Sequence, residues 1–411
     1  MRQPLPETGA AWDEVKARML GYAAGDVRWR EGKTAVYVFN AGPEVERVQK
    51  EAYALFMSEN GLGPMAFPSL KRMEDEVAGF GLSLLHAPDD AVGTITAGGT
   101  DSITMALKAA RDYARKRKGV RGPLNIVLPR SAHPAFDKAA AVMEIEVRRT
   151  PLKAFLADPT AIDAAADAAT VMIVGSAPCF PYGLIDPIAA LSDLAVARDL
   201  WLHVDACVGG YIAPFVRLNG ADIAPFDFEL AGVRSISADL HKYGYCAKGA
   251  STVFFRSAEL QKFMIFDFND WPGGRMVTPT LAGTRPGGAI SAAWAVMNFL
   301  GVAGYRAKQG LVTGARERIE AGVRALGFTV LGVPQLGIVA FSHDEVNGLA
   351  VWAKLRERGW FTSMTSEPAG LHLMLSPFHA EVADVYLADL EWALGAVKAA
   401  AAPAAAEARY S

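Results

Sequence analysis

The sequence predicts an α/β protein with two unequal parts: a large domain built on a mostly parallel sheet, and a smaller C-terminal α+β domain. Three observations predict this fold class. From about residue 92, short apolar runs alternate with stretches of helical periodicity, as in a parallel sheet covered by helices on both faces. After residue 300 the strand candidates become shorter and fewer. A chain of 411 residues also exceeds one small core, so two domains are expected.

The large domain is predicted from apolar runs of strand length that are separated by helical stretches. The runs are VGTIT, NIVLP, EIEVRR, VMIVGS, WLHVDA, VRSISA and STVFFR. The helices include DSITMALKAARDYARKRKG, which has Gly119 as its stop signal, and HPAFDKAAAVM. We expect this domain to span residues 61–300. An arm of residues 1–60 precedes it, and its few periodic signals indicate that it packs on something else.

The small domain is expected over residues 301–400. A long helix from RPGGAISAAWAVMNFLG leads into it, and further helices are predicted near 308–326, 345–358 and 380–399. Its strands are predicted at GFTVLG, LGIVAF and LHLMLS. The Ala-rich end predicts a fraying helix followed by a loose tail at residues 401–411.

Composition excludes several classes of function. The net charge of −3 provides no basic field for nucleic acid. The three cysteines are too few and too scattered for a disulfide framework or a zinc site, so no metal is expected and a reducing compartment is indicated. No signal peptide and no run of roughly 18 apolar residues is found, so we expect a cytoplasmic protein without an integral membrane segment.

Three motifs of the large domain carry candidate chemistry. TAGGTDS places Gly98, Gly99 and Thr100 between a strand and a helix, where free backbone N–H groups suit a phosphate. A tight turn with Thr100 or Asp101 as helix N-cap explains the same residues equally well. HVDACVGG puts Asp205 at the end of a strand, where α/β folds bind ligands and where aspartates also cap turns.

The third motif, SADLHKYGY, contains Lys242 among small and aromatic residues. Lysines are usually solvated, but a desolvated lysine can form a Schiff base. A phosphate cradle, then an acid, then a lysine is the set of parts that pyridoxal 5'-phosphate requires: phosphate anchor, partner of the pyridine nitrogen, and amine. His133, between cradle and acid, is a candidate to stack on the ring, although a lone histidine is more often a core or surface residue.

The motifs together resemble the sphingosine-1-phosphate lyases, a branch of the fold type I pyridoxal-phosphate enzymes akin to the group II amino-acid decarboxylases. The resemblance covers roughly residues 28–380. It rests on TAGGTDS, SAHPAFDKAA, APCFPYGLIDPI, HVDACVGGY, FDFELAGVRSISADLHKYGYCAKGAS and TPTLAGTRPGG. ISADLHKYGYCAKG is specific to this branch, whereas HVDA is shared more widely.

The resemblance implies a role for each matching residue. Lys242 is the implied Schiff-base lysine, Asp205 the partner of the pyridine nitrogen and His133 the ring-stacking residue, and these three are the implied catalytic residues. The implied cofactor contacts are Gly98, Gly99, Thr100, Ser237, His241 and, from the neighbouring subunit of a homodimer, Gly283 and Thr284. The implied substrate contacts are Tyr37, Lys248 and Tyr243.

One departure concerns the substrate. The lyases carry a histidine where NGLGPMAFP has Gly63, which removes a group for substrate phosphate or for acid–base chemistry. The implied reaction is cleavage of a phosphorylated amino alcohol, such as a sphingoid base phosphate, into an aldehyde and phosphoethanolamine. Decarboxylation of an amino acid is the alternative, and a non-catalytic protein on the same fold is a third reading. Candidates for the general base are Tyr37, His133, Tyr243 and Tyr245.

Overall fold

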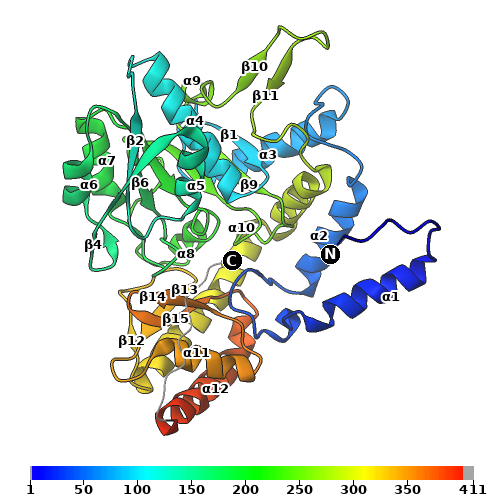
Figure 1. Ribbon diagram of the computed structural model, residues 1–411, viewed down its shortest axis with the longest axis vertical. Coiled ribbons are helices and arrows are strands. Elements are labelled where there is room, and N and C mark those ends of the chain that lie inside the picture. The colour runs from blue at the N-terminus through cyan, green and yellow to red at the C-terminus, as the bar shows by residue number, and fades with distance from the viewer. Residues whose placement is uncertain (1, 401–411) are drawn as a thin grey trace.

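A seven-stranded sheet forms the centre of the molecule in the computed structural model, which describes residues 2–400 (Figure 1). Its strand order is β1-β9-β8-β7-β6-β2-β3. The strands are β1 (Val92–Thr96), β2 (Leu124–Pro129), β3 (Ile145–Thr150), β6 (Thr170–Ser176), β7 (Leu202–Asp205), β8 (Val233–Ala238) and β9 (Ser251–Phe255). All pairs are parallel except the two that β9 makes with β1 and β8. The prediction of a mostly parallel sheet is therefore confirmed.

Helices cover both faces of this sheet, because successive side chains of each buried strand point to opposite faces. On one face, α4 (Gly99–Lys116) and α5 (Ala135–Met143) share an apolar layer with Trp201, Met172 and Val174. On the other face, α7 (Ile188–Ala197) and α8 (Ala213–Leu218) join a larger core with Ile173 and Val204. Smaller elements complete the domain: β4 (Leu152–Lys153), β5 (Leu156–Ala157), α6 (Pro159–Ala165) and α9 (Ala258–Gln261).

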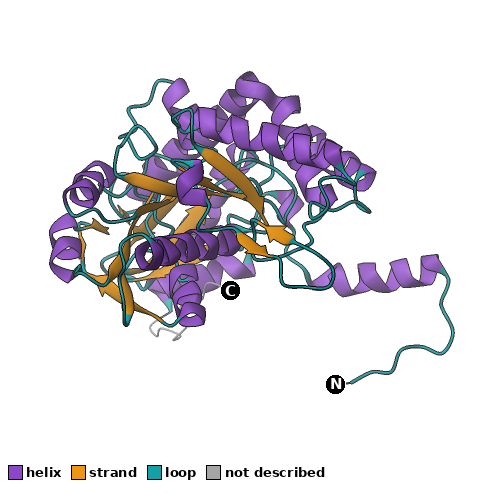
Figure 2. Cartoon of the chain, turned by 90° about the horizontal axis from the view of Figure 1, so that it is seen from above, coloured by secondary structure: helices purple, strands orange, loops and turns teal. Residues whose placement is uncertain are grey.

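Two segments project from the body of the protein. The hairpin of β10 (Phe266–Phe268) and β11 (Met276–Thr278) extends beyond the sheet (Figure 1). The helix α1 (Trp12–Tyr22) extends away on its own in Figure 2, and none of its residues is buried. The short helices η1 (Ala23–Gly25) and η2 (Trp29–Glu31) then lead the chain back to the body.

The helix α10 (Gly287–Ala325) links the two parts of the chain. It breaks at Gly301 (φ 54°, ψ −175°), so it corresponds to the two helices that the sequence predicts, with the second beginning earlier than expected. The helices α2 (Pro43–Leu55) and α3 (Pro68–Leu84) pack against it. By length and composition α10 suffices to cross a membrane, but half of its most apolar window is buried inside the protein, as in a core helix.

The C-terminal part is a four-stranded antiparallel sheet with helices. Its strand order is β12-β13-β15-β14. The elements are β12 (Thr329–Val330), β13 (Ile338–Ser342), α11 (Gly348–Glu357), β14 (Ser363–Ser366), β15 (Ala369–Met374) and α12 (His379–Ala399). The three predicted strands are confirmed as β12, β13 and β15, whereas β14 is an addition to the prediction. The predicted tail at residues 401–411 lies outside the described residues.

Candidate active site

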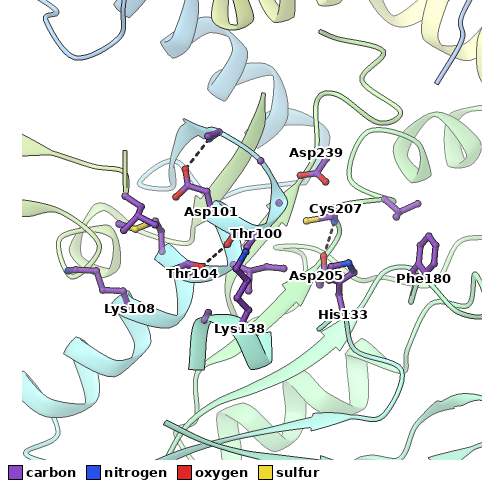
Figure 3. Close-up of a pocket in the computed structure, with 18 of the residues that line it drawn as sticks. Thr100, Asp101, Thr104, Lys108, His133, Lys138, Phe180, Asp205, Cys207 and Asp239 are labelled. Atoms are coloured by element: carbon purple, nitrogen blue, oxygen red, sulfur yellow. Dashed lines mark hydrogen bonds between the residues drawn. The ribbon is translucent and has the colours of Figure 1, made fainter. Parts of the chain in front are cut away.

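A cavity of about 810 Å³ lies where β7 ends and α4 begins (Figure 3). Residues from six separate stretches of the sequence line it together. Seven of the predicted site residues are among them: Gly98, Gly99, Thr100, His133, Asp205, His241 and Lys242. The cradle, the acid, the histidines and the lysine that the sequence singles out therefore share one cavity.

The cradle is formed by the turn between β1 and α4. The helix begins at Gly99 with Gly98 as its N-cap, so neither Thr100 nor Asp101 caps it as the alternative interpretation expected. The Asp101 carboxylate instead accepts a hydrogen bond from the Ala97 amide at 3.0 Å. The amides of the first turn have no intrahelical acceptor, and the helix dipole favours an anion beside them. The local structure thus suits a phosphate group.

Gly99 also packs closely against the residues that follow β7 and β8. A Cβ built there would lie 2.9 Å from the Asp239 carboxylate and 2.9 Å from the Cys207 sulfur. A side chain at this position would therefore have to displace buried groups on the wall of the cavity. The close approach requires glycine for reasons of space.

Asp205 ends β7 and faces the cavity with only 7% of its surface exposed. Its Oδ1 atom accepts hydrogen bonds from the Cys207 amide at 3.1 Å and from the Ser237 hydroxyl at 3.3 Å. Ser237 lies opposite Asp205 on the parallel strand β8. Ser237 does not line the cavity and supports Asp205 from below, and its predicted contact with the cofactor stays a prediction.

Lys242 is held beside a carboxylate that the sequence prediction missed. Its Nζ atom lies 3.1 Å from Oδ2 of Asp239, and both side chains are largely buried. Burial raises the pKa of Asp239, but its interactions with the Lys242 ammonium and the neighbouring His241 outweigh that effect, so the pKa lies below its usual value. The available sequence signals were its place directly after the strand β8 and its spacing of three residues from Lys242.

His133 lies on the loop between β2 and α5 and is labelled next to Asp205 in Figure 3. Its Nδ1 atom accepts a hydrogen bond from the Ala135 amide at 3.1 Å, which orients the ring. Burial lowers the pKa of His133 below 6.5, and burial likewise lowers the pKa of His241. Both imidazoles are therefore neutral at pH 7 and can pack against an aromatic ring or donate a hydrogen bond without a charge.

Lys248 and Tyr37, the predicted substrate contacts, are neighbours. Lys248 Nζ donates to the carbonyl oxygens of Tyr37 (2.8 Å) and His241 (3.2 Å) and lies 5.3 Å from the centre of the Phe39 ring. Although Lys248 as a residue is exposed, desolvation of its ammonium group, reinforced by the charge of Lys242, lowers its pKa to about 8. A small hollow of about 110 Å³ beside the main cavity is lined by Lys248, Phe39 and His241.

Tyr243 does not line the main cavity, and its predicted substrate contact stays a prediction. Its side chain is fully buried, and its hydroxyl donates to the Leu375 carbonyl at 2.7 Å. Tyr245, a candidate base, is also buried and stacks on Tyr305 with ring centres 6.0 Å apart. Burial raises the pKa of both hydroxyls well above the usual value, so both phenols stay protonated at neutral pH.

Gly283 and Thr284 lie in the loop between β11 and α10, and neither lines the cavity. Leu281 of the same loop does. The role predicted for Gly283 and Thr284 belongs to a neighbouring subunit and stays a prediction. Gly63 lies in the turn before α3, where its carbonyl oxygen accepts from the amide of Phe67 at 2.9 Å, and it lines neither the main cavity nor the hollow beside it.

A second cavity of about 960 Å³ was not foreseen. It shares His133 and Phe180 with the first, and the turn between β14 and β15 closes its far side. The hydroxyl of Tyr182 donates to the Glu367 carbonyl at 2.7 Å, which ties this turn to the large domain. Because β14 was not predicted, this wall of the second cavity could not be placed from the sequence.

Arg285, the arginine of the motif LAGTRPGG, is fully engaged inside the protein. It pairs with the buried Glu74 and donates to the carbonyls of Ile95 (2.9 Å) and Gly61 (3.0 Å). An arginine that is satisfied in this way is not free to bind a substrate carboxylate. Arg285 therefore ties β1, α3 and the segment near residue 61 together.

The residues of the main cavity fit pyridoxal 5'-phosphate. The space beside Gly99 and the amides at the start of α4 suit its phosphate, and Asp205 offers a buried carboxylate to a protonated ring nitrogen. Lys242 supplies the amine: among the described residues, it is the one lysine of the cavity lining that is paired with Asp239. These roles remain predictions for the individual residues.

Comparison with known proteins places the chain in a family. Residues 38–344 match the model described as the pyridoxal-dependent decarboxylase conserved domain. A sphingosine-1-phosphate lyase of Oryza sativa is 39% identical over 98% of this chain and 76% of its own length. The structure of a Burkholderia pseudomallei sphingosine-1-phosphate lyase superposes with a TM-score of 0.93 at 36% identity, covering 97% of this chain and 94% of that one.

A protein named as a probable L-tyrosine/L-aspartate decarboxylase from Methanothrix thermoacetophila is 37% identical over 84% of this chain and 87% of its own length. The lyases match a larger share of the chain, from plants to animals and fungi. The chain therefore belongs to the pyridoxal-dependent decarboxylase family and is a homologue of the sphingosine-1-phosphate lyases within it.

Proposed function

We propose that the protein binds pyridoxal 5'-phosphate in the main cavity and cleaves a phosphorylated amino alcohol of the sphingoid-base class into an aldehyde and phosphoethanolamine. One observation carries the proposal: the phosphate cradle, Asp205, His133 and Lys242 line a single cavity. The near full-length similarity to sphingosine-1-phosphate lyases supports the choice of reaction.

When bound, the cofactor supplies an electron sink for the pair released as the Cα–Cβ bond breaks. Asp205 keeps the sink effective, because a buried carboxylate favours the protonated form of the ring nitrogen. A base takes the proton of the 3-hydroxyl as the aldehyde forms, and His133 is the candidate base that lines the cavity. Cα gains a proton to give phosphoethanolamine. In this proposal Lys242 delivers that proton, and the amine that lines the cavity and the neighbouring Asp239, which can hold its ammonium form, support this role.

The substrate phosphate is assigned to Lys248. The Lys248 ammonium donates a hydrogen bond to the carbonyl oxygen of His241, and His241 lines both the main cavity and the small hollow. A lysine acts on a phosphate as a point charge. Lys248→Ala is expected to raise KM for phosphorylated amines far more than for unphosphorylated ones. An equal rise for both would remove Lys248 from the phosphate site.

Decarboxylation is the second candidate, favoured by the similarity to the probable decarboxylase from Methanothrix. It requires a group that orients the substrate carboxylate, and Arg285 is already paired with Glu74. The two reactions give different products from matched substrates. Aldehyde and phosphoethanolamine from a phosphorylated amino alcohol support the lyase, whereas carbon dioxide from tyrosine, aspartate or glutamate without aldehyde release supports the decarboxylase.

The cofactor claim is tested by absorbance of the purified protein after addition of pyridoxal 5'-phosphate. The wild type is expected to show the visible band of the bound cofactor, and Lys242→Ala is expected to lose it. Lys108→Ala is the matched control, because Lys108 also lines the cavity but pairs with Asp112. A wild type that stays colourless would contradict the proposal and favour a non-catalytic protein on this fold.

We also propose a cytoplasmic homodimer. The exposed face of α1 and the hairpin carry apolar side chains that a single chain leaves uncovered: Trp12, Met19, Leu20, Tyr22, Phe266, Phe268 and Trp271. Such clustered exposure is typical of an interface. Sedimentation should give a dimer mass, and Trp12→Asp with Leu20→Asp should shift it toward the monomer. A wild type that sediments as a monomer would exclude this assembly.

A further inference from the structure

A line of buried polar side chains crosses the apolar layer beneath the main cavity. Trp201, His203 and Asp205 alternate along β7 and its approach, and Ser235 and Ser237 lie opposite His203 and Asp205 on β8. His203 and both serines are completely buried, and Trp201 is 2% exposed. Polar groups in such a layer persist when each of them is hydrogen-bonded, so their pairing carries information.

The hydrogen bonds join the five residues in one chain. Trp201 Nε1 lies 2.8 Å from Ser235 Oγ, which lies 2.8 Å from His203 Nδ1. His203 Nε2 lies 3.2 Å from Ser237 Oγ, and Ser237 Oγ lies 3.3 Å from Asp205 Oδ1. The chain thus begins at an indole and ends on the carboxylate that faces the cavity.

The chemistry of the two ends determines the direction of every bond. An indole N–H can only donate, so Ser235 accepts from Trp201. Ser235 gives its own hydrogen to Nδ1 of His203, because the bond from Ser237 to Asp205 requires Nε2 to carry the ring proton. Burial lowers the pKa of His203 to about 4, so the ring is neutral and carries its proton on Nε2. Nε2 then donates to Ser237, whose hydroxyl donates to the Asp205 carboxylate, a group that only accepts when ionised.

We propose that His203 is a positioning residue that acts through Ser237 to hold Asp205 ionised and oriented toward the cavity. The inference rests on the proposed function, since Asp205 matters there as the partner of a ring nitrogen. A donor directed at a carboxylate stabilises its charged form. The Cys207 amide donates its hydrogen bond to Oδ1 of Asp205 as well, so Oδ2 is left to accept from a donor in the cavity.

Other groups also act on Asp205, and the experiment must separate their effect from that of His203. The titratable groups that face it are His133, Asp186, Cys207, Asp239 and Lys242. A change at His203 alters the partner of none of these groups. A change at Ser237 also removes the acceptor of the Cys207 thiol, which lies 3.3 Å from Ser237 Oγ. The His203 variants therefore carry the test, and the Ser237 variant supports it.

The test measures the ring nitrogen of bound ¹⁵N-labelled pyridoxal 5'-phosphate by NMR between pH 6 and 10, together with the dissociation constant of the cofactor. In the wild type the ring nitrogen is expected to stay protonated well above neutral pH. His203→Leu and Ser237→Ala should each lower the pH at which it loses its proton by about one unit and weaken cofactor binding several-fold. His203→Gln, which retains an N–H near Nε2, should restore part of both.

Phe136→Leu is the control for the packing of this layer. The rings of Phe136 and His203 meet edge to face with their centres 5.7 Å apart, and Phe136 is as fully buried as His203. Phe136 takes no part in the chain of hydrogen bonds. This variant should lose stability while the ring nitrogen titrates as in the wild type. If His203→Leu fails to fold, His203→Asn compared with His203→Gln decides the question, because the shorter amide can still pair with Ser235 but does not reach Ser237.

The outcomes are distinguishable. A wild-type titration in both His203→Leu and Ser237→Ala would show that His203 only fills the core, and would leave the proposed function intact. A wild type that binds no cofactor would overturn the proposed function and this inference with it. If His203→Gln restores neither the protonation of the ring nitrogen nor the affinity for the cofactor that His203→Leu loses, a donor role for Nε2 would be contradicted.

Discussion

Gly99 shows how strongly one residue of the cradle is constrained. The Asp239 carboxylate and the Cys207 sulfur both lie 2.9 Å from the position that a Cβ would take there. Contacts below 3 Å between a carbon and such atoms force one of them to move. Asp239 cannot move without disturbing Lys242, to which it is paired. The steric limit at Gly99 is thereby coupled to the reactive lysine.

We predict that Gly99→Ala weakens pyridoxal 5'-phosphate binding by about tenfold or more, because about 1.4 kcal/mol of strain at the cradle already gives this factor. Fluorescence titration of the apoprotein measures it. Gly79→Ala in α3 is the control, since nothing lies within 4 Å of its added carbon. Unchanged affinity in Gly99→Ala would mean that the cofactor does not depend on this turn.

Lys248 should make substrate binding depend on pH. Its pKa of about 8 means that the ammonium is charged below pH 8 and loses its charge above it. KM for a phosphorylated substrate is therefore expected to rise as the pH passes 8. Lys248→Arg should remove this rise, because arginine stays charged throughout the range. A rise of equal size in the arginine variant would assign the effect to another group.

At the scale of elements, the buried pair of Arg285 and Glu74 holds the frame of the site. Glu74 lies on α3 and also accepts from the Ile95 amide on β1 at 3.0 Å, while Arg285 precedes α10. The pair thus joins two helices and an edge strand. β1 leads directly into the cradle, so its position determines where α4 begins.

Arg285→Met should lower the free energy of unfolding by about 3–5 kcal/mol, because it leaves the Glu74 carboxylate buried without its partner. Arg318→Met is the matched control, since Arg318 pairs with Asp384 at the exposed surface, where solvent screens such pairs and they contribute little to stability. Urea denaturation measures both. Similar losses in the two variants would show that the buried pair has no special role.

At the scale of the whole molecule, buried titratable groups link folding to pH. Burial lowers the pKa of His203, His372 and His379 to about 4 each, and raises that of Asp186 to about 6. Between pH 4 and 6 the unfolded chain binds protons on the histidines that the folded chain does not bind. Asp186 acts in the opposite direction, because between pH 4 and 6 its carboxyl is protonated in the folded state and ionised in the unfolded state. The proton that Asp186 releases on unfolding offsets the proton that one histidine takes up.

The protein should therefore lose stability as the pH falls from about 6 to 4, by up to about 3 kcal/mol per pH unit for a net uptake of about two protons on unfolding. Urea denaturation at several pH values measures the slope. His372→Gln should reduce it by the contribution of one proton, about 1.4 kcal/mol per pH unit. Stability that is constant from pH 6 to 4 would contradict the assignment of neutral buried histidines.

Periodicity was enough to predict most of the fold. All strands of the seven-stranded sheet and all strands of the four-stranded sheet except β14 were expected, because their apolar runs differ from the helical spacing around them. The antiparallel direction of β9 was beyond prediction, since an apolar run has no direction. The exposed hairpin of β10 and β11 was missed because its strands, three residues each, are too short to show alternation.

The sequence by itself determined which side chains can carry the chemistry: Lys242, Asp205, His133 and the glycines at the start of α4 lie at strand ends and turns that local patterns reveal. The tertiary structure decided what each of them contacts. Tyr243 and Arg285 stand in motifs beside the site, yet their partners, Leu375 and Glu74, lie more than a hundred residues away in the chain. Periodicity reports only neighbours in sequence, whereas burial and hydrogen bonding depend on segments that folding brings together.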